Sequence, residues 1–97
     1  MPPSFVPPRL PSGATATQTA RSVRVLRLAL IDAIAEHLAR TPLPQGELAK
    51  MLGISRPRLN RLLKREVELF GLDSLVAIAA RSGLTLRLSI SRPYRGR

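Results

Sequence analysis

The chain has 97 residues, no cysteine and one histidine, and its 16 Lys and Arg against six Asp and Glu give a formal net charge of +10. So short a chain forms one domain at most, and without cysteine it has neither disulfides nor thiolate metal ligands. No apolar run reaches the roughly 18 residues of a membrane span, and the charge predicts a polyanionic partner, for which nucleic acid is favoured over an acidic membrane surface.

Residues 1–20 hold more than half of the prolines and are otherwise rich in Ser, Thr, Gly and Ala. Such a composition buries too little apolar surface to offset the entropy lost on ordering, so we expect a disordered arm. Two roles remain open for it: a frayed terminus, or an arm that follows a DNA groove or binds a partner protein. The prolines also interrupt the apolar run that a secretory signal peptide needs.

The segment from Arg21 to Arg40 predicts an amphipathic helix with Ser22 as its N-cap. An apolar seam and a second apolar flank run along it, so we expect one side to cover the rest of the domain and the other to meet a second subunit. The basic start also allows a helix that lies on a membrane surface, which Asp32 and Glu36 on the polar side disfavour. The seam residues are Leu26, Leu30, Ile34 and Leu38, and the flank residues are Val25, Leu28 and Ile31.

Residues 43–65 carry the pattern of two short helices joined by a tight turn. The prolines within residues 41–44 end the preceding helix, because a proline lacks a donor and pushes the residue before it out of the α region. Gly53 suits a left-handed helix end, Ser55 suits the N-cap of the next helix, and Pro57 falls in a first turn, where a missing N–H costs nothing. This layout predicts a helix-turn-helix, whose second helix lies in the DNA major groove.

The outward face of the second helix is basic. When its leucines (Leu59, Leu62 and Leu63) face inward, the opposite side carries amide and cationic groups and no acid. Arginine can bind guanine and asparagine can bind adenine through paired hydrogen bonds, whereas other cations contact phosphates. We expect base contacts from Arg56, Asn60 and Arg61, and phosphate contacts from Lys50, Ser55, Arg58, Lys64 and Arg65.

The chain after this motif predicts a short loop, a last helix and a strand. Phe70 in the loop is expected to fill the core, and Gly83 to end a helix that runs from residue 71 to residue 81. The buried positions of that helix are expected to be Leu75, Val76, Ile78 and Ala79. Residues 84–90 alternate apolar and polar side chains, which predicts a strand. Its apolar face consists of Leu84, Leu86, Leu88 and Ile90.

A lone strand leaves both of its edges without hydrogen-bond partners. The simplest partner is the same strand of a second copy, which gives an antiparallel ribbon and a two-fold dimer with those four apolar residues in its interface. Two reading helices related by a dyad would match a palindromic operator with half-sites about one DNA turn apart. Alternatively the strand or the arm binds a different protein. We expect residues 91–97 to form a flexible basic tail.

These residues resemble the lambda-repressor-like (Cro/C1, or XRE) helix-turn-helix regulators, and most closely a small antitoxin-type subgroup. The resemblance extends over residues 24–90. Two positions depart from the family pattern: Pro44 replaces a small or hydroxyl cap, and Arg56 replaces a Gln, which alters the expected base preference rather than the fold. The resemblance is carried by Gln45, residues 47–49, residues 51–55, residues 57–59, residues 62–63, residues 69–73 and residues 75–83.

The resemblance implies an all-α, compact four-helix domain over residues 21–90, with one C-terminal strand paired across a dimer. It implies that Gln45 touches a phosphate, although an ordinary polar role in the first turn of its helix is equally open. It also implies a repressor that is the antitoxin of a type II toxin–antitoxin operon, represses its own promoter and binds a toxin of the RelE/ParE type. A protein that mainly neutralises a toxin, and a free-standing repressor, remain alternatives.

No set of residues in the chain predicts an enzyme, a cofactor or a metal. There is no nucleophile with a matching base, no pair of carboxylates, no phosphate-binding loop and no metal-ligand spacing. His37 has no second ligand nearby, so we expect it to be solvated or hydrogen-bonded locally. The absence of cysteine fits the reducing cytoplasm, where we expect the protein, associated with the nucleoid when it is bound to DNA.

Overall fold

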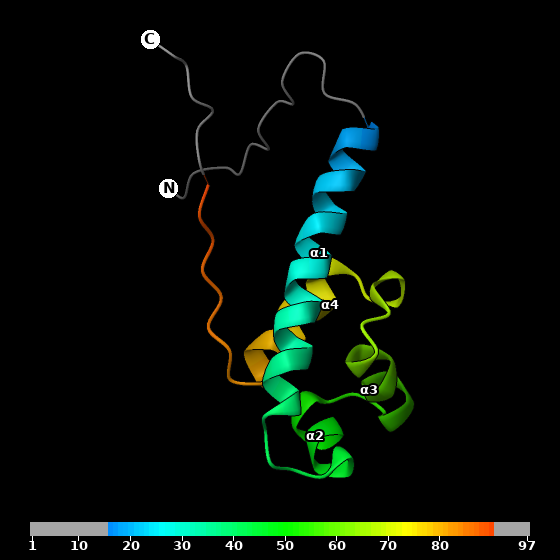
Figure 1. Ribbon diagram of the computed structural model, residues 1–97, viewed down its shortest axis with the longest axis vertical. Coiled ribbons are helices and arrows are strands. Elements are labelled where there is room, and N and C mark those ends of the chain that lie inside the picture. The colour runs from blue at the N-terminus through cyan, green and yellow to red at the C-terminus, as the bar shows by residue number, and fades with distance from the viewer. Residues whose placement is uncertain (1–15, 91–97) are drawn as a thin grey trace, which may run out of the picture.

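The computed structural model describes residues 16–90, and within them the fold is all-α. Figure 1 shows the long helix α1 with α2 below its end, α3 and the short η1 helix to one side, and α4 packed behind it. The predicted tail and most of the predicted arm lie outside the described residues. The elements are α1 (Ala16–Ala39), α2 (Gln45–Leu52), α3 (Arg56–Leu63), the 3-10 helix η1 (Val67–Leu69) and α4 (Leu72–Arg81).

Helix α1 begins at Ala16, five residues before the predicted start at residue 21. Ser22 therefore lies inside the helix, and its prediction as the N-cap is wrong. Residues 16–20 contain neither Pro nor Gly, so nothing in the sequence interrupts the helix there. The C-terminal half of α1 covers the core, whereas the N-terminal half extends past the bundle and leaves Val25 and Leu26 exposed.

The buried stripe of α1 differs from the predicted four-residue seam. Leu26 is 46% exposed and Leu30 is only half-buried, whereas Ile31 and Ala35 are buried with Ile34 and Leu38. A helix has 3.6 residues per turn, so a row of side chains spaced by four rotates by about 40° at each step. Such a row leaves the core after two steps, and the true stripe alternates spacings of three and four.

The segment from α2 to α3 forms the predicted helix-turn-helix. Pro44 is the N-cap of α2, and its C-cap is Gly53, which is left-handed with φ of 69°. The Gly53 N–H donates to Lys50 O and the Ile54 N–H donates to Ala49 O. Ser55 caps α3, because its Oγ accepts from the Arg58 N–H at 3.2 Å. The predictions for Gly53 and Ser55 are confirmed.

One apolar core joins the helices. Phe70 is fully buried, as predicted, between the end of η1 and the start of α4. In α4 the prediction for Val76 is wrong, because its side chain is 41% exposed. At 100° per residue Val76 lies 160° from Ile78, so both cannot face the same core. The core consists of Ile31, Ile34, Leu38, Leu48, Ala49, Leu52, Leu59, Leu62, Val67, Phe70, Leu75, Ile78 and Ala79.

Residues 84–90 follow the left-handed Gly83 and run along the side of α1 (Figure 1). Leu84 packs against the core, but Leu88 is 79% exposed and Ile90 is 81% exposed. Residues 84–90 have no regular secondary structure, and nothing between residues 16 and 90 pairs with them as a strand. A strand needs a hydrogen-bonding neighbour. It therefore stays a prediction that residues 84–90 form a strand when they pair with a second chain. Among residues 16–90, none of the helices combines the length and the hydropathy that a membrane span requires.

Candidate nucleic-acid interface

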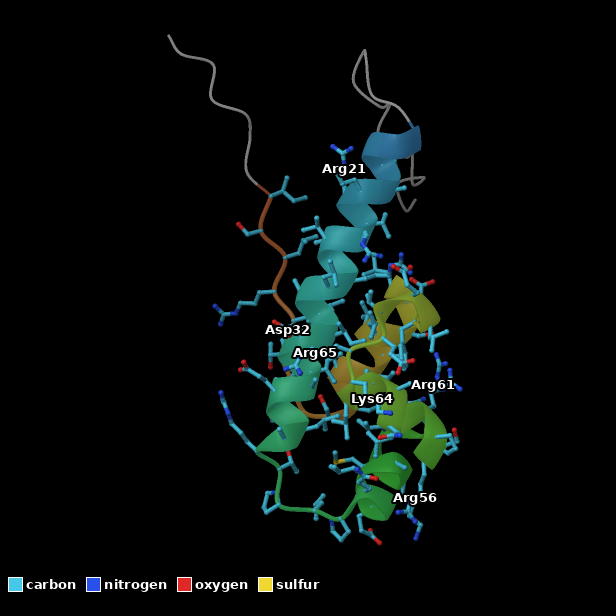
Figure 2. All side chains as sticks on the ribbon, turned by 45° about the vertical axis from the view of Figure 1, so that its right-hand side comes forward. Arg21, Asp32, Arg56, Arg61, Lys64 and Arg65 are labelled. Atoms are coloured by element: carbon cyan, nitrogen blue, oxygen red, sulfur yellow. The ribbon has the colours of Figure 1, made fainter. Side chains whose placement is uncertain are left out.

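The outer side of α3 presents cationic and amide groups to solvent. Arg56, Asn60, Arg61 and Lys64 are all exposed, and none of their side chains forms a hydrogen bond or ion pair with another residue in 16–90. Figure 2 shows Arg56 and Arg61 projecting from the side of α3 that faces away from α1. We call these four residues the outer face of α3.

Two conditions keep the outer face accessible. Leu59 and Leu62 are fully buried and Leu63 is half-buried, so the apolar side of α3 packs against the core of the domain and the opposite side faces solvent. The described ion pairs also lie elsewhere, since Arg24 pairs with Glu68, Arg40 with Glu36, and Arg65 with Asp32. Acidic side chains thus neutralise arginines at other places, and the outer face keeps its positive charge.

Arg58 lies in α3 but is turned toward the protein. Its guanidinium carbon is 4.2 Å from the centre of the Phe70 ring, and its Nη1 donates to Leu69 O at 3.4 Å. A cation over an aromatic ring contributes about 0.5–1 kcal/mol at a partly exposed site. Arg58 therefore ties the first half of α3 to the end of η1, a role that the sequence did not predict.

Arg65 lies just beyond the end of α3 and is the one non-glycine residue of positive φ in the described chain, with φ of 59°. The Arg65 N–H donates to Leu62 O and the Glu66 N–H donates to Arg61 O, which closes the helix in the manner of a Schellman motif. This backbone turn directs the side chain to α1, where Nε donates to Asp32 Oδ1 at 2.5 Å (Figure 2). Arg65 is therefore set apart from the outer face.

Two arginines of α1 hold the connection between α3 and α4. Arg24 pairs with Glu68 of η1, and the Arg27 Nη1 donates to Phe70 O at 3.2 Å. The sequence prediction treated both as part of a basic helix start. The spacing of the two arginines indicates that they face the protein. Positions 24, 27, 31 and 34 share one helix face, and Ile31 and Ile34 are buried.

The other predicted phosphate contacts lie at the ends of the motif helices. Gln45 is exposed as the first residue of α2, and Lys50 is exposed near the end of that helix. The Ser55 Oγ is already the cap acceptor of α3. Because a hydroxyl both accepts and donates, its proton is left for an anion.

The described residues contain no group of three or more His, Cys, Asp or Glu side chains that could hold a metal ion. The His37 Nε2 lies 2.9 Å from Ser82 O, and since a carbonyl only accepts, this nitrogen carries the proton. His37 therefore links α1 to the end of α4 across 45 positions of the chain, whereas the sequence predicted a side chain that is solvated or hydrogen-bonded locally.

A family model described as a helix-turn-helix domain matches residues 16–91. The match covers all of the residues described above, from the first residue of α1 to the segment after α4. A comparison with curated proteins finds no match.

Proposed function

The chain belongs to the helix-turn-helix domain family, and from this premise we propose that it is a regulator of transcription that binds double-stranded DNA in a sequence-specific manner. The observation that supports this best is the outer face of α3, where three cations and an amide are exposed without a partner among residues 16–90. In a helix-turn-helix this helix enters the major groove. The net charge of +10 favours association with the polyanion.

The outer face divides by donor type into base readers and phosphate contacts. Arg56 and Arg61 offer paired donors to guanine, and Asn60 offers a donor and an acceptor to adenine. Each such pair discriminates against the wrong base by about 1–3 kcal/mol. Lys64 supplies a point charge, which suits a phosphate.

The remaining phosphate contacts come from residues at the rim of the motif. Lys50, Gln45 and Ser55 are free to reach a backbone phosphate at the ends of α2 and α3. Arg58 and Arg65 already use donors on Leu69 and Asp32. A guanidinium carries five N–H groups, so both can still donate to a phosphate. We expect them to contribute less than Lys64.

We propose that the protein binds its operator as a homodimer. Exposed apolar residues of the single chain support this proposal. They are Leu86, Leu88 and Ile90 after α4, and Val25 and Leu26 on α1. Pairing of residues 84–90 across a two-fold axis would give the strand its hydrogen bonds and would cover the leucines. Two copies of α3 related by that axis read a palindromic DNA site.

A finer proposal concerns the biological role. The resemblance to antitoxin-type regulators supports an antitoxin of a type II toxin–antitoxin operon that represses its own promoter and also binds a toxin. The basic outer face of α3 favours DNA binding as its main activity over toxin neutralisation alone. A free-standing repressor differs from an antitoxin only in lacking a toxin partner. Co-expression with the product of the neighbouring reading frame tests this, because the antitoxin proposal requires a stable complex.

The proposed function is tested by selecting a preferred duplex from random-sequence DNA with the full chain and then measuring affinity for it. We expect Arg61→Ala to relax the preference at one base position by about 1–3 kcal/mol, since it removes a base contact. Lys64→Ala should weaken selected and scrambled duplexes alike and should lower the salt dependence by about one phosphate contact.

Arg21→Ala is the matched control, because it also removes one positive charge, but in the N-terminal part of α1, far from α3 (Figure 2). It should leave the base preference unchanged. The proposal fails if the protein selects no preferred duplex, or if Arg61→Ala and Lys64→Ala behave like the Arg21 control.

A further inference from the structure

We infer that Arg81 of α4 is a positioning residue for DNA recognition, because it fixes the turn between α2 and α3 and so directs α3. The inference rests on the proposed DNA-binding role of α3. Arg81 is the last residue of α4, and its Nη1 donates to Leu52 O at 3.1 Å, across 29 positions of the chain. The sequence analysis treated Arg81 only as a helix end.

The acceptor lies at the C-terminal end of α2. The last four carbonyls of a helix lack partners inside that helix. In α2 the Ala49 and Lys50 carbonyls accept from the amides of the turn, and the Leu52 carbonyl accepts from Arg81. A cation here also interacts favourably with the negative end of the α2 dipole. Such a charge-assisted bond is stronger than a neutral one.

Gly53 keeps space for the guanidinium. A Cβ added to Gly53 would lie 2.5 Å from the Arg81 Nη1 and 3.5 Å from its Cζ. Any larger residue would therefore force the guanidinium of Arg81 to shift from this position. Gly53 thus meets two requirements at once: the left-handed φ of 69° that the turn needs, and the open space that the arginine occupies.

Helix α4 is a firm base for this contact. Leu75 and Ala79 of α4 are fully buried, and the Ser82 carbonyl after α4 accepts from His37 of α1. Packing of leucines between α2 and α3 restricts the crossing angle of the helices only to a range of about 15–20°. The bond from Arg81 adds a directional link between the turn and the pair formed by α1 and α4. Base contacts require donor–acceptor distances of about 2.7–3.2 Å, so a small rotation of α3 breaks them.

The first test needs no DNA. Arg81→Met keeps an unbranched side chain and removes the donors, and Arg21→Met removes the same charge at the far end of α1. In Arg81→Met we expect hydrogen exchange at the Gly53 and Ile54 amides to become about tenfold faster, relative to any change at the Leu62 amide. In Arg21→Met we expect no such increase at the two turn amides. Arg81→Lys, which keeps a donor, should fall between them and replaces Arg81→Met if that variant is unfolded. Exchange at the turn that stays as slow as in Arg21→Met overturns the inference.

A double-mutant cycle tests the shared space. Gly53→Ala should lower the folding equilibrium constant in both backgrounds, because the left-handed φ remains. The decrease caused by Gly53→Ala should be several-fold smaller in the Arg81→Met background, because no guanidinium is then present for the added methyl group to displace. Equal losses in both backgrounds would show that Arg81 does not occupy the space beside Gly53.

The second test measures recognition with two duplexes, one that the wild-type protein selects from random DNA and a scrambled version of it. Arg81→Met should reduce the affinity ratio between them about tenfold, whereas its affinity for the scrambled duplex equals that of Arg21→Met. Equal weakening on both duplexes would make Arg81 a phosphate contact and overturn its positioning role. A wild-type protein that selects no duplex refutes the proposed function instead, and the exchange experiment then decides the inference on Arg81.

Discussion

Arg61 and Arg65 lie four residues apart at the end of α3, yet their side chains serve different parts of the molecule. Arg61 is exposed on the outer face, whereas Arg65 is turned by its left-handed backbone toward Asp32 of α1. The chain pattern shows both as basic residues of one helix and cannot separate them. The deciding contact joins positions 33 residues apart, and only the folded chain brings them together.

Arg65 leads to a prediction about stability. Arg65→Gly and Arg65→Ala both remove the ion pair with Asp32, which is exposed and worth at most about 1 kcal/mol. Only glycine adopts the φ of 59° without a steric penalty. We therefore expect Arg65→Gly to be more stable than Arg65→Ala by about 1 kcal/mol, measured as the free energy of unfolding in urea. Equal stability of the two variants would contradict a left-handed residue at this position.

At the scale of elements, the sequence predicted helices α1 to α4 and the turn between α2 and α3, but it predicted a loop where the 3-10 helix η1 lies. Gly53 and Ser55 were decisive, because each suits one backbone position for a stated physical reason. The errors came from tertiary context. The start of α1 was placed five residues late, and Val76 was placed in the core although the partner helices of α4 contact only one of its faces. Arg24 and Arg27 were missed because their partners lie in η1 and at its end.

The segment after α4 leads to a prediction about assembly. Leu88 is 79% exposed. In the proposed strand, successive side chains alternate, so Leu88 would lie on the apolar side and Ser89 on the opposite side. In a strand-paired dimer, Leu88→Lys places a charge in the interface and should raise the Kd of dimerisation at least about tenfold, whereas Ser89→Lys points outward and should change it little. Sedimentation equilibrium measures both. If neither variant alters the assembly, residues 84–90 are not the dimer contact.

Across residues 16–90, the arginines that form ion pairs and the cations without an acidic partner lie in different places. The three described ion pairs fix α1 to η1, α1 to the end of α3, and the last turn of α1 to itself. The cations of the outer face of α3 stay free of any described partner. Figure 2 shows this separation, with Arg65 beside Asp32 and with Arg56 and Arg61 on the far side of α3. One set of arginines thus pairs with acidic side chains inside the domain, and another set stays exposed on α3, where we propose that it binds DNA.

The most direct test of this account is an NMR titration of the isotope-labelled full chain with the duplex that it selects from random-sequence DNA. We predict that the largest amide shifts fall on residues 55–64 and on Gln45, with little change around Arg21 at the far end of α1. Shifts concentrated on α1, with none on the outer face of α3, would contradict the assignment of α3 as the helix that reads DNA.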